Sequence, residues 1–166
     1  MDRTMLRPRI VKVLVVTALP LVLAVARPAL SAEAGDGPMT VIKTFIDDFN
    51  KGDIAGAEAT HAKKVSIIDE FPPHTWTGST AFKDWVADLE KDAKAHGQTN
   101  QKLTLGRTVR SQADGDTAYV VVAGTFKYKE QGKAMVEPGQ LAFALTKDGD
   151  AWKIAAWAWA GTKPHS

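Results

Sequence analysis

The chain has 166 residues, of which 45% are hydrophobic and 24% are charged, as expected for one globular domain. It contains no cysteine, which excludes disulfides, thiolate catalysis, thiolate metal sites and a lipid anchor on cysteine. Five of its 21 basic residues, but only one of its 19 acidic residues, lie within residues 1–32. The remainder therefore has a net charge of −2, so we expect no nucleic-acid partner.

The N-terminus has the three parts of an export signal. Basic residues between Arg3 and Lys12 precede an apolar stretch at residues 13–26, and small residues follow. The small residues predict cleavage between Ser31 and Ala34. The apolar stretch is shorter than the ~20 residues of a membrane-spanning helix, although an uncleaved anchor is the alternative. We expect a periplasmic or secreted protein without membrane contact after cleavage, divided into a signal peptide (1–32), a tether (33–37) and one domain (38–163).

Three helices are predicted in the first half of that domain. Apolar residues recur at helical spacing from about Met39, and Gly52 is a typical residue for ending this helix. Asp53 is a typical N-cap for a second, short helix that ends near residue 61. A third, amphipathic helix is expected between residues 80 and 97.

One early strand and a later run of four strands complete the predicted elements. The early strand, residues 64–71, alternates so that Val65, Ile67, Asp69 and Phe71 share one face. The later strands are separated by glycine-containing turns, which indicates an antiparallel meander. The order predicts an α+β fold with the helices on one face of a curved sheet. The four later strands are expected at residues 103–110, 117–129, 140–146 and 152–160.

The last of these strands is apolar on both faces. One face would carry residues 152, 154, 156 and 158, and the other would carry Trp157 and Trp159. The helices can cover only one face of the sheet, so a second copy of the chain is the simplest cover for the other. We therefore predict a homodimer.

Four short motifs, in this order and at these spacings, resemble the nuclear transport factor 2-like superfamily, especially its SnoaL-like and ketosteroid-isomerase-like branch. The resemblance spans residues 38–162. It implies a cone-shaped, curved, antiparallel or mixed sheet with three N-terminal helices packed on its concave face. It does not imply one function, because the superfamily includes isomerases, cyclases, dehydratases, binding modules and assembly domains. The motifs are Phe-Asn-Lys-Gly-Asp at 49–53, the strand residues 65–69, Trp-Thr-Gly at 76–78 and Asp-Gly-Asp-Ala-Trp-Lys-Ile at 148–154.

The resemblance also places the general base of the isomerase branch at Asp69. The strand pattern agrees, because Asp69 belongs to an apolar row, where a carboxylate lies at a cavity mouth or has a raised pKa. The alternative is a solvated carboxylate or one paired with a lysine. The family's two oxyanion donors fall on Phe45 and near Leu141, which cannot donate hydrogen bonds. We therefore do not expect steroid isomerisation by the family's known mechanism.

Aromatic side chains and one histidine supply the candidates for ligand binding, namely Phe45, His74, Trp76 and Trp157. Trp76 lies in a loop near the candidate base, and Trp157 and Trp159 lie on a strand. Packing in the core or in a dimer is the alternative for all three tryptophans.

The remaining tryptophans and histidines suggest no further site. Trp85 and Trp152 are expected in the core. His61 and His74 flank Asp69 in sequence, but their spacing matches no metal motif. We predict neither a metal nor another cofactor.

Two functional hypotheses follow from these residues. The leading one is an exported domain that binds a small hydrophobic organic molecule in the cavity of the cone, with general acid–base chemistry at Asp69 as a special case. The alternative is a non-catalytic homodimerisation or protein-association module.

Overall fold

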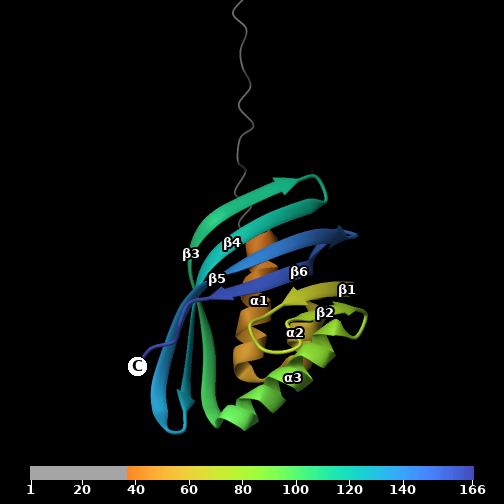
Figure 1. Cartoon of the computed structure of the whole chain (residues 1–166). Helices are drawn as coiled ribbons and strands as arrows, with labels where there is room; N and C mark the ends of the chain where they lie inside the picture. Colours follow the sequence, from red (N-terminus) through yellow and green to blue (C-terminus); the bar gives the residue numbers. More distant parts are fainter. Residues whose placement is uncertain (1–36) are drawn as a thin grey trace, which may run out of the picture. The chain divides into compact units, whose positions relative to one another are not determined.

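A computed structural model describes residues 37–166, and in Figure 1 they form three helices against one curved, open sheet. The predicted signal peptide and most of the predicted tether lie outside the described residues. None of the helices within residues 37–166 is both long and apolar enough to cross a membrane. The helices are α1 (Pro38–Lys51), α2 (Ile54–Ala59) and α3 (Ala81–His96).

The helices begin and end at the residues that local sequence signals indicate. Gly52 ends α1 in the left-handed conformation (φ 76°), which glycine adopts without a steric penalty. The side chain of Asp53 caps α2 by accepting a hydrogen bond from the backbone N–H of Gly56 at 2.9 Å. Gly97 ends α3 in the same left-handed conformation. All three predicted helices are therefore confirmed.

The sheet has six strands in the order β2-β1-β6-β5-β4-β3. The pairing of β1 with β6 is parallel, and every other pairing is antiparallel, so the predicted mixed sheet is confirmed. Strands β3 to β6 form the predicted meander, with tight turns at glycines of positive φ. The strands are β1 (His61–Ile68), β2 (Thr75–Gly78), β3 (Gln98–Asp114), β4 (Thr117–Glu130), β5 (Lys133–Asp148) and β6 (Ala151–Gly161).

The early strand differs from its prediction in its bounds and in its partner. β1 begins at His61 and ends at Ile68, so Asp69 lies just beyond the strand. Trp76 belongs to β2, a short strand that pairs with β1 and was not predicted. Within β1 the predicted alternation is confirmed, because Val65 and Ile67 are buried while Ile68 is 54% exposed.

A β-bulge in β6 corrects the predicted faces of the last strand. Leu145 pairs with Ile154 and Ala144 pairs with Ala156, which leaves Ala155 as an extra residue. Ile154 and Trp157 are consequently both buried, although strict alternation would place them on opposite faces. Period-two counting was wrong here because the bulge shifts the register by one residue.

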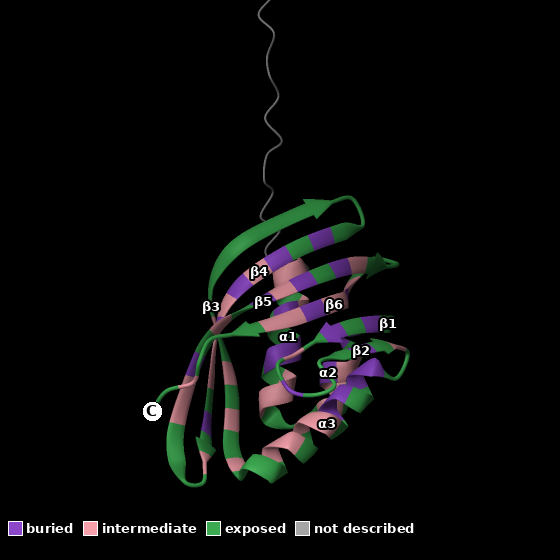
Figure 2. Cartoon of the chain, in the orientation of Figure 1, coloured by how far each residue is buried: buried purple, intermediate pink, exposed green. Residues whose placement is uncertain are grey.

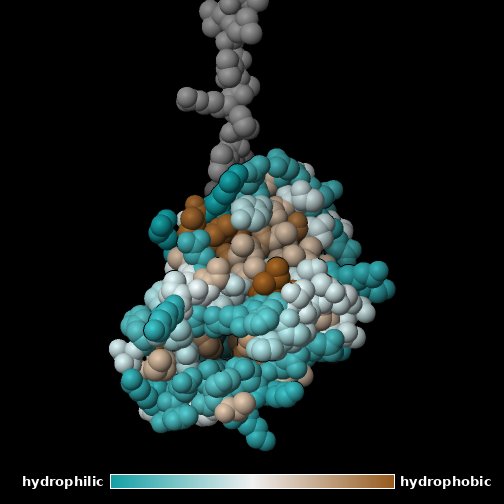
Figure 3. Space-filling model, in the orientation of Figure 1, coloured by the Kyte–Doolittle hydropathy of each residue, from teal (hydrophilic) through white to brown (hydrophobic). Residues whose placement is uncertain are grey.

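The core lies between the helices and the concave face of the sheet. In Figure 2 the buried residues of α1 and α3 face the strands. Along β4 and β5, buried residues alternate with more exposed ones. The outer face of the sheet remains partly exposed and apolar, with Tyr119 44% exposed and Ala142 and Ala158 paired across neighbouring strands. Figure 3 shows apolar atoms gathered over this part of the sheet.

Candidate functional site

A cavity of about 100 Å³ lies between α1, α3 and the inner face of the sheet. Figure 3 shows a hollow with apolar atoms in its depth, in the region between α3 and the sheet in Figure 1. Eight of the sixteen lining residues are aromatic, four are aliphatic, and Asp69, Glu70, Asp92 and Gln98 are polar. The walls are thus mainly apolar with a few converging polar groups, as in many small-molecule sites.

Asp69 is held at the cavity wall by two hydrogen bonds. Its Oδ2 accepts from the indole Nε1 of Trp85 at 2.9 Å, and its Oδ1 accepts from the backbone N–H of Glu70 at 2.8 Å. Burial raises the pKa of Asp69 to about 6, although both hydrogen bonds oppose the rise. Asp69 is therefore an oriented carboxylate that is more basic than an ordinary aspartate.

Glu70 and Glu137 form an acidic pair beside Asp69. Glu137 is 1% exposed, and its Oε1 accepts a hydrogen bond from the indole Nε1 of Trp159 at 3.3 Å. A Cβ atom on Gly161 would overlap this carboxylate, so only glycine leaves room for it. Burial, followed by the hydrogen bond to Glu137, raises the pKa of Glu70 to about 7. The two adjacent carboxylates repel each other, which favours the protonated form of Glu70.

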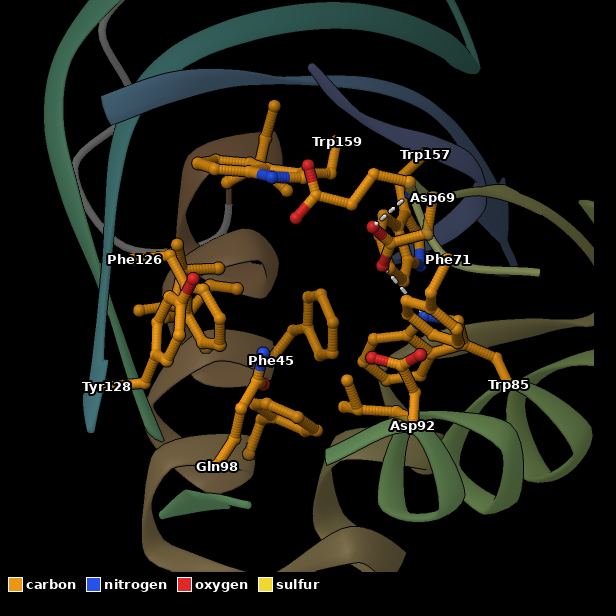
Figure 4. Close-up of a pocket in the computed structure, with 16 residues that line it drawn as sticks. Phe45, Asp69, Phe71, Trp85, Asp92, Gln98, Phe126, Tyr128, Trp157 and Trp159 are labelled. Carbon is orange, nitrogen blue, oxygen red and sulfur yellow. Dashed lines mark hydrogen bonds between the residues drawn. The ribbon is translucent and has the colours of Figure 1, made fainter. Parts of the chain in front are cut away.

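The cavity has an acidic side and an aromatic side. Figure 4 shows Asp69 and Asp92 on one side, with Phe126 and Tyr128 across from them. Tyr128 is buried, and burial raises the pKa of its hydroxyl, which therefore stays protonated at neutral pH. A ligand between these sides meets a base at one end and a hydroxyl donor at the other.

The structure brings together some of the predicted site residues. Asp69, Phe45 and Trp157 all line the cavity. Leu141 lines it as well, so the two positions where the resemblance implies oxyanion donors carry apolar side chains.

Two other candidates lie outside the cavity lining. Trp76 is buried, donates a hydrogen bond to Asp88 Oδ2 at 2.9 Å and packs on Phe71. His74 is exposed in the loop between β1 and β2, with Nδ1 3.2 Å from the backbone oxygen of Asp69.

His61 belongs to the core. Its Nδ1 lies 2.9 Å from the backbone oxygen of Ala57, and its Nε2 accepts a hydrogen bond from Trp157 Nε1 at 3.1 Å. This network fixes the tautomer with the proton on Nδ1. Burial lowers the pKa of His61 to about 4, so the ring is neutral and holds Trp157 against the cavity. Within residues 37–166, no group of three histidine or acidic side chains is arranged to hold a metal.

Sequence reasoning missed Glu70, Glu137 and Tyr128, and only Tyr128 had a usable signal. Tyr128 continues the alternating row of β4 that buries Val120 and Val122, so extending that row would have identified it. Glu70 falls within the strand predicted at residues 64–71, on the face opposite Asp69, but β1 ends before it. Glu137 precedes a proline and was not placed in any predicted strand.

The sequence matches the SnoaL-like domain family over residues 39–158, and the chain belongs to this family. No protein of curated function matches the sequence.

Solved structures share the fold at low sequence identity. A ketosteroid isomerase-like protein from Erwinia carotovora atroseptica is 19% identical, with a TM-score of 0.58, and the match covers 76% of this chain and 94% of that one. A protein of unknown function from Mycobacterium tuberculosis is 14% identical (TM-score 0.61, 75% and 69% covered). The CaMKII hub of S. rosetta is 18% identical (TM-score 0.61, 78% and 100% covered).

Proposed function

We propose that this chain is an exported SnoaL-like domain that binds a small hydrophobic organic molecule in its cavity, with Asp69 as a general base. The observation that carries the proposal is the Asp69 carboxylate, which two hydrogen bonds orient at an aromatic cavity wall. At about 100 Å³ the cavity is smaller than an apolar site of about 150 Å³ that accepts benzene, so it limits a bound ligand to about one ring. A ligand of one ring with a small polar group is the best fit.

The environment of Asp69 supports proton transfer to or from such a ligand. With a pKa of about 6, the carboxylate is ionised at neutral pH but is a stronger base than a solvated aspartate. Phe45 and Leu141 offer no hydrogen bond to a developing oxyanion, which argues against steroid isomerisation by the family's known mechanism.

Ligand binding can be tested through tryptophan fluorescence, because Trp85, Trp157 and Trp159 line the cavity. Phenethyl alcohol is a suitable neutral probe of one ring, and we expect its titration to saturate. Leu103→Phe fills part of the cavity and should weaken binding, whereas Leu105→Phe alters the same strand outside the lining and serves as the matched control. Equal binding by both variants would place the probe elsewhere.

The proposed base can be tested by hydrogen exchange. Asp69 would remove a proton from the methyl group of bound acetophenone and return a deuteron from heavy water, which NMR detects without a full reaction. Asp69→Asn should abolish exchange above the buffer rate, and Asp88→Asn, which alters a carboxylate outside the lining, should not. Unchanged exchange in the Asp69 variant excludes it as the base.

The export step rests on the basic and apolar pattern of residues 1–32. Expression of the full chain in a bacterial host with cell fractionation tests it. We expect the protein outside the cytoplasm, with an N-terminus between residues 32 and 34 by mass spectrometry. Full-length protein in the cytoplasmic fraction would contradict this part of the proposal.

We also propose a homodimer through the outer face of the sheet, because that face is apolar and partly exposed. Ala158 pairs with Ala142 at its centre, and Tyr119 and Ile68 are 44% and 54% exposed on the same face. The similarity to a hub domain from S. rosetta is consistent with association. Sedimentation should show a dimer that Ala158→Glu converts to a monomer, whereas a wild-type monomer at all concentrations would rule the dimer out.

A further inference from the structure

Aromatic rings make up much of the cavity wall, and two of them are in edge-to-face contact. The rings of Trp85 and Trp157 meet at 89° with their centroids 4.9 Å apart, and Trp85 also donates the hydrogen bond to Asp69. The rings of Trp159 and Tyr128 line other parts of the cavity. Aromatic faces that surround a small volume attract positive charge because the electron density of each ring lies above and below its plane.

Three of the polar lining residues are acidic, Gln98 and Tyr128 are neutral, and none of the lining residues is basic. Asp69, Glu70 and Asp92 line it, and buried Glu137 lies behind Glu70. Within residues 37–166, the one basic group in ion-pair range of these four carboxyl groups is the exposed His96, 3.3 Å from Asp92. The carboxylates on this side of the cavity therefore have no lysine or arginine counter-ion among the described residues.

We propose that the ligand of this cavity is an organic cation, specifically an amine or quaternary ammonium compound that carries one aromatic or similarly compact apolar group. The inference rests on the proposed function, because it names the class of ligand for the same cavity. The cationic nitrogen lies beside the Asp69 carboxylate, and the apolar group extends toward Phe126 and Tyr128 (Figure 4).

The hydrogen bonds already present leave Asp69 able to hold such a nitrogen. Each carboxylate oxygen has two acceptor sites, and the bonds from Trp85 and from the Glu70 backbone use one site on each oxygen. An ammonium N–H can occupy a remaining site, and a quaternary ammonium group can contact the carboxylate and the rings without a hydrogen bond. The positive charge of a ligand in direct contact with Asp69 stabilises the ionised form of this carboxylate, which burial alone disfavours.

The same features discriminate against ligands of other charge. A neutral ligand of equal shape gains the apolar contacts but leaves the partly buried carboxylates uncompensated. An anion of equal shape is repelled by Asp69, Glu70 and Asp92 together. Charge, rather than shape, therefore selects the ligand, and a series of probes with one skeleton separates the two contributions.

Three probes with the same phenyl group test the inference, namely phenethylammonium, phenethyl alcohol and phenylacetate. Binding to the wild-type protein is measured by fluorescence and calorimetry at about pH 8 and low salt, where Asp69 and Glu70, with pKa values of about 6 and about 7, are largely ionised. We expect the cation to bind at least about tenfold more tightly than the alcohol, and phenylacetate not to bind. Leu103→Phe should weaken binding of the cation if it occupies the cavity.

Two substitutions, each of which removes one carboxylate, show which carboxylate causes the preference for the cation. Asp69→Asn should reduce the ratio of cation to alcohol affinity about tenfold, whereas Asp88→Asn, outside the lining, should leave the ratio unchanged. If the alcohol binds as tightly as the cation, the cation inference is overturned and the proposed cavity function stands. If a folded sample binds none of the three probes, both are overturned. Cation binding that Leu103→Phe does not weaken is surface adsorption and also overturns the inference.

Discussion

Replacing Trp85 by phenylalanine should raise the pKa of Asp69 without emptying the aromatic wall. Phenylalanine keeps a ring at this buried position but lacks the indole N–H that donates to Asp69 Oδ2 at 2.9 Å. This hydrogen bond is the strongest influence that lowers the pKa of Asp69 against the effect of burial. A hydrogen bond to a charged group contributes about 1.5–3 kcal/mol, and Asp69 is partly exposed, so the lower figure applies. The pKa should rise by about one.

Carbon-13 NMR of the side-chain carboxyl groups measures this shift directly, and the pH midpoint of acetophenone exchange should move with it. Trp76→Phe is the matched control, because Trp76 donates an indole hydrogen bond of the same length, 2.9 Å, to Asp88 outside the cavity lining. The reasoning is refuted if the Asp69 midpoint stays in place in Trp85→Phe, or if it moves equally in the control.

Three further variants test the energetics of the site. Between about pH 4 and pH 6 folded Asp69 retains a proton that the unfolded chain has released, so its contribution to stability falls as pH rises. Between pH 4 and pH 7 the free energy of unfolding of Asp69→Asn should therefore increase by about 2 kcal/mol relative to that of the wild type, as measured by urea unfolding. A difference that does not change with pH would contradict this. Glu137→Gln removes the neighbouring carboxylate, so the pKa of Glu70 should fall below about 7 in an NMR titration, and no fall would mean that burial alone raises it. Gly161→Ala should destabilise the fold by about 1–3 kcal/mol, because the new methyl group overlaps Glu137. Gly106→Ala is the control and should destabilise the fold less, because its methyl group meets only Ala123.

The helices and the buried face of β1 were predictable because their signals are local. Gly52 and Asp53 mark a helix end and a helix start within two adjacent residues, and the structure uses both as expected. Asp69 follows a short apolar alternation whose buried face, Val65 and Ile67, is confirmed. Neither inference needed information about distant parts of the chain.

The acidic pair and the faces of the last strand depend on distant contacts. Glu137 becomes a buried partner of Glu70 only because β5 brings it beneath Trp159, and nothing near either residue indicates that meeting. The bulge at Ala155 shifts the register by one residue, and it is recognisable only from the pairing with β5. Pairing between distant segments limited the sequence interpretation here.

The parallel pairing of β1 with β6 means that the two ends of the domain must meet before the site exists. Asp69 follows β1, whereas Trp157 and Trp159 arrive on β6, the last strand to be synthesised. Contacts between segments so far apart form slowly, because a long loop must close first. A chain that ends before β6 lacks one wall of the cavity and the inner neighbour of β1. Folding, and with it ligand binding, is therefore deferred until the whole domain is available.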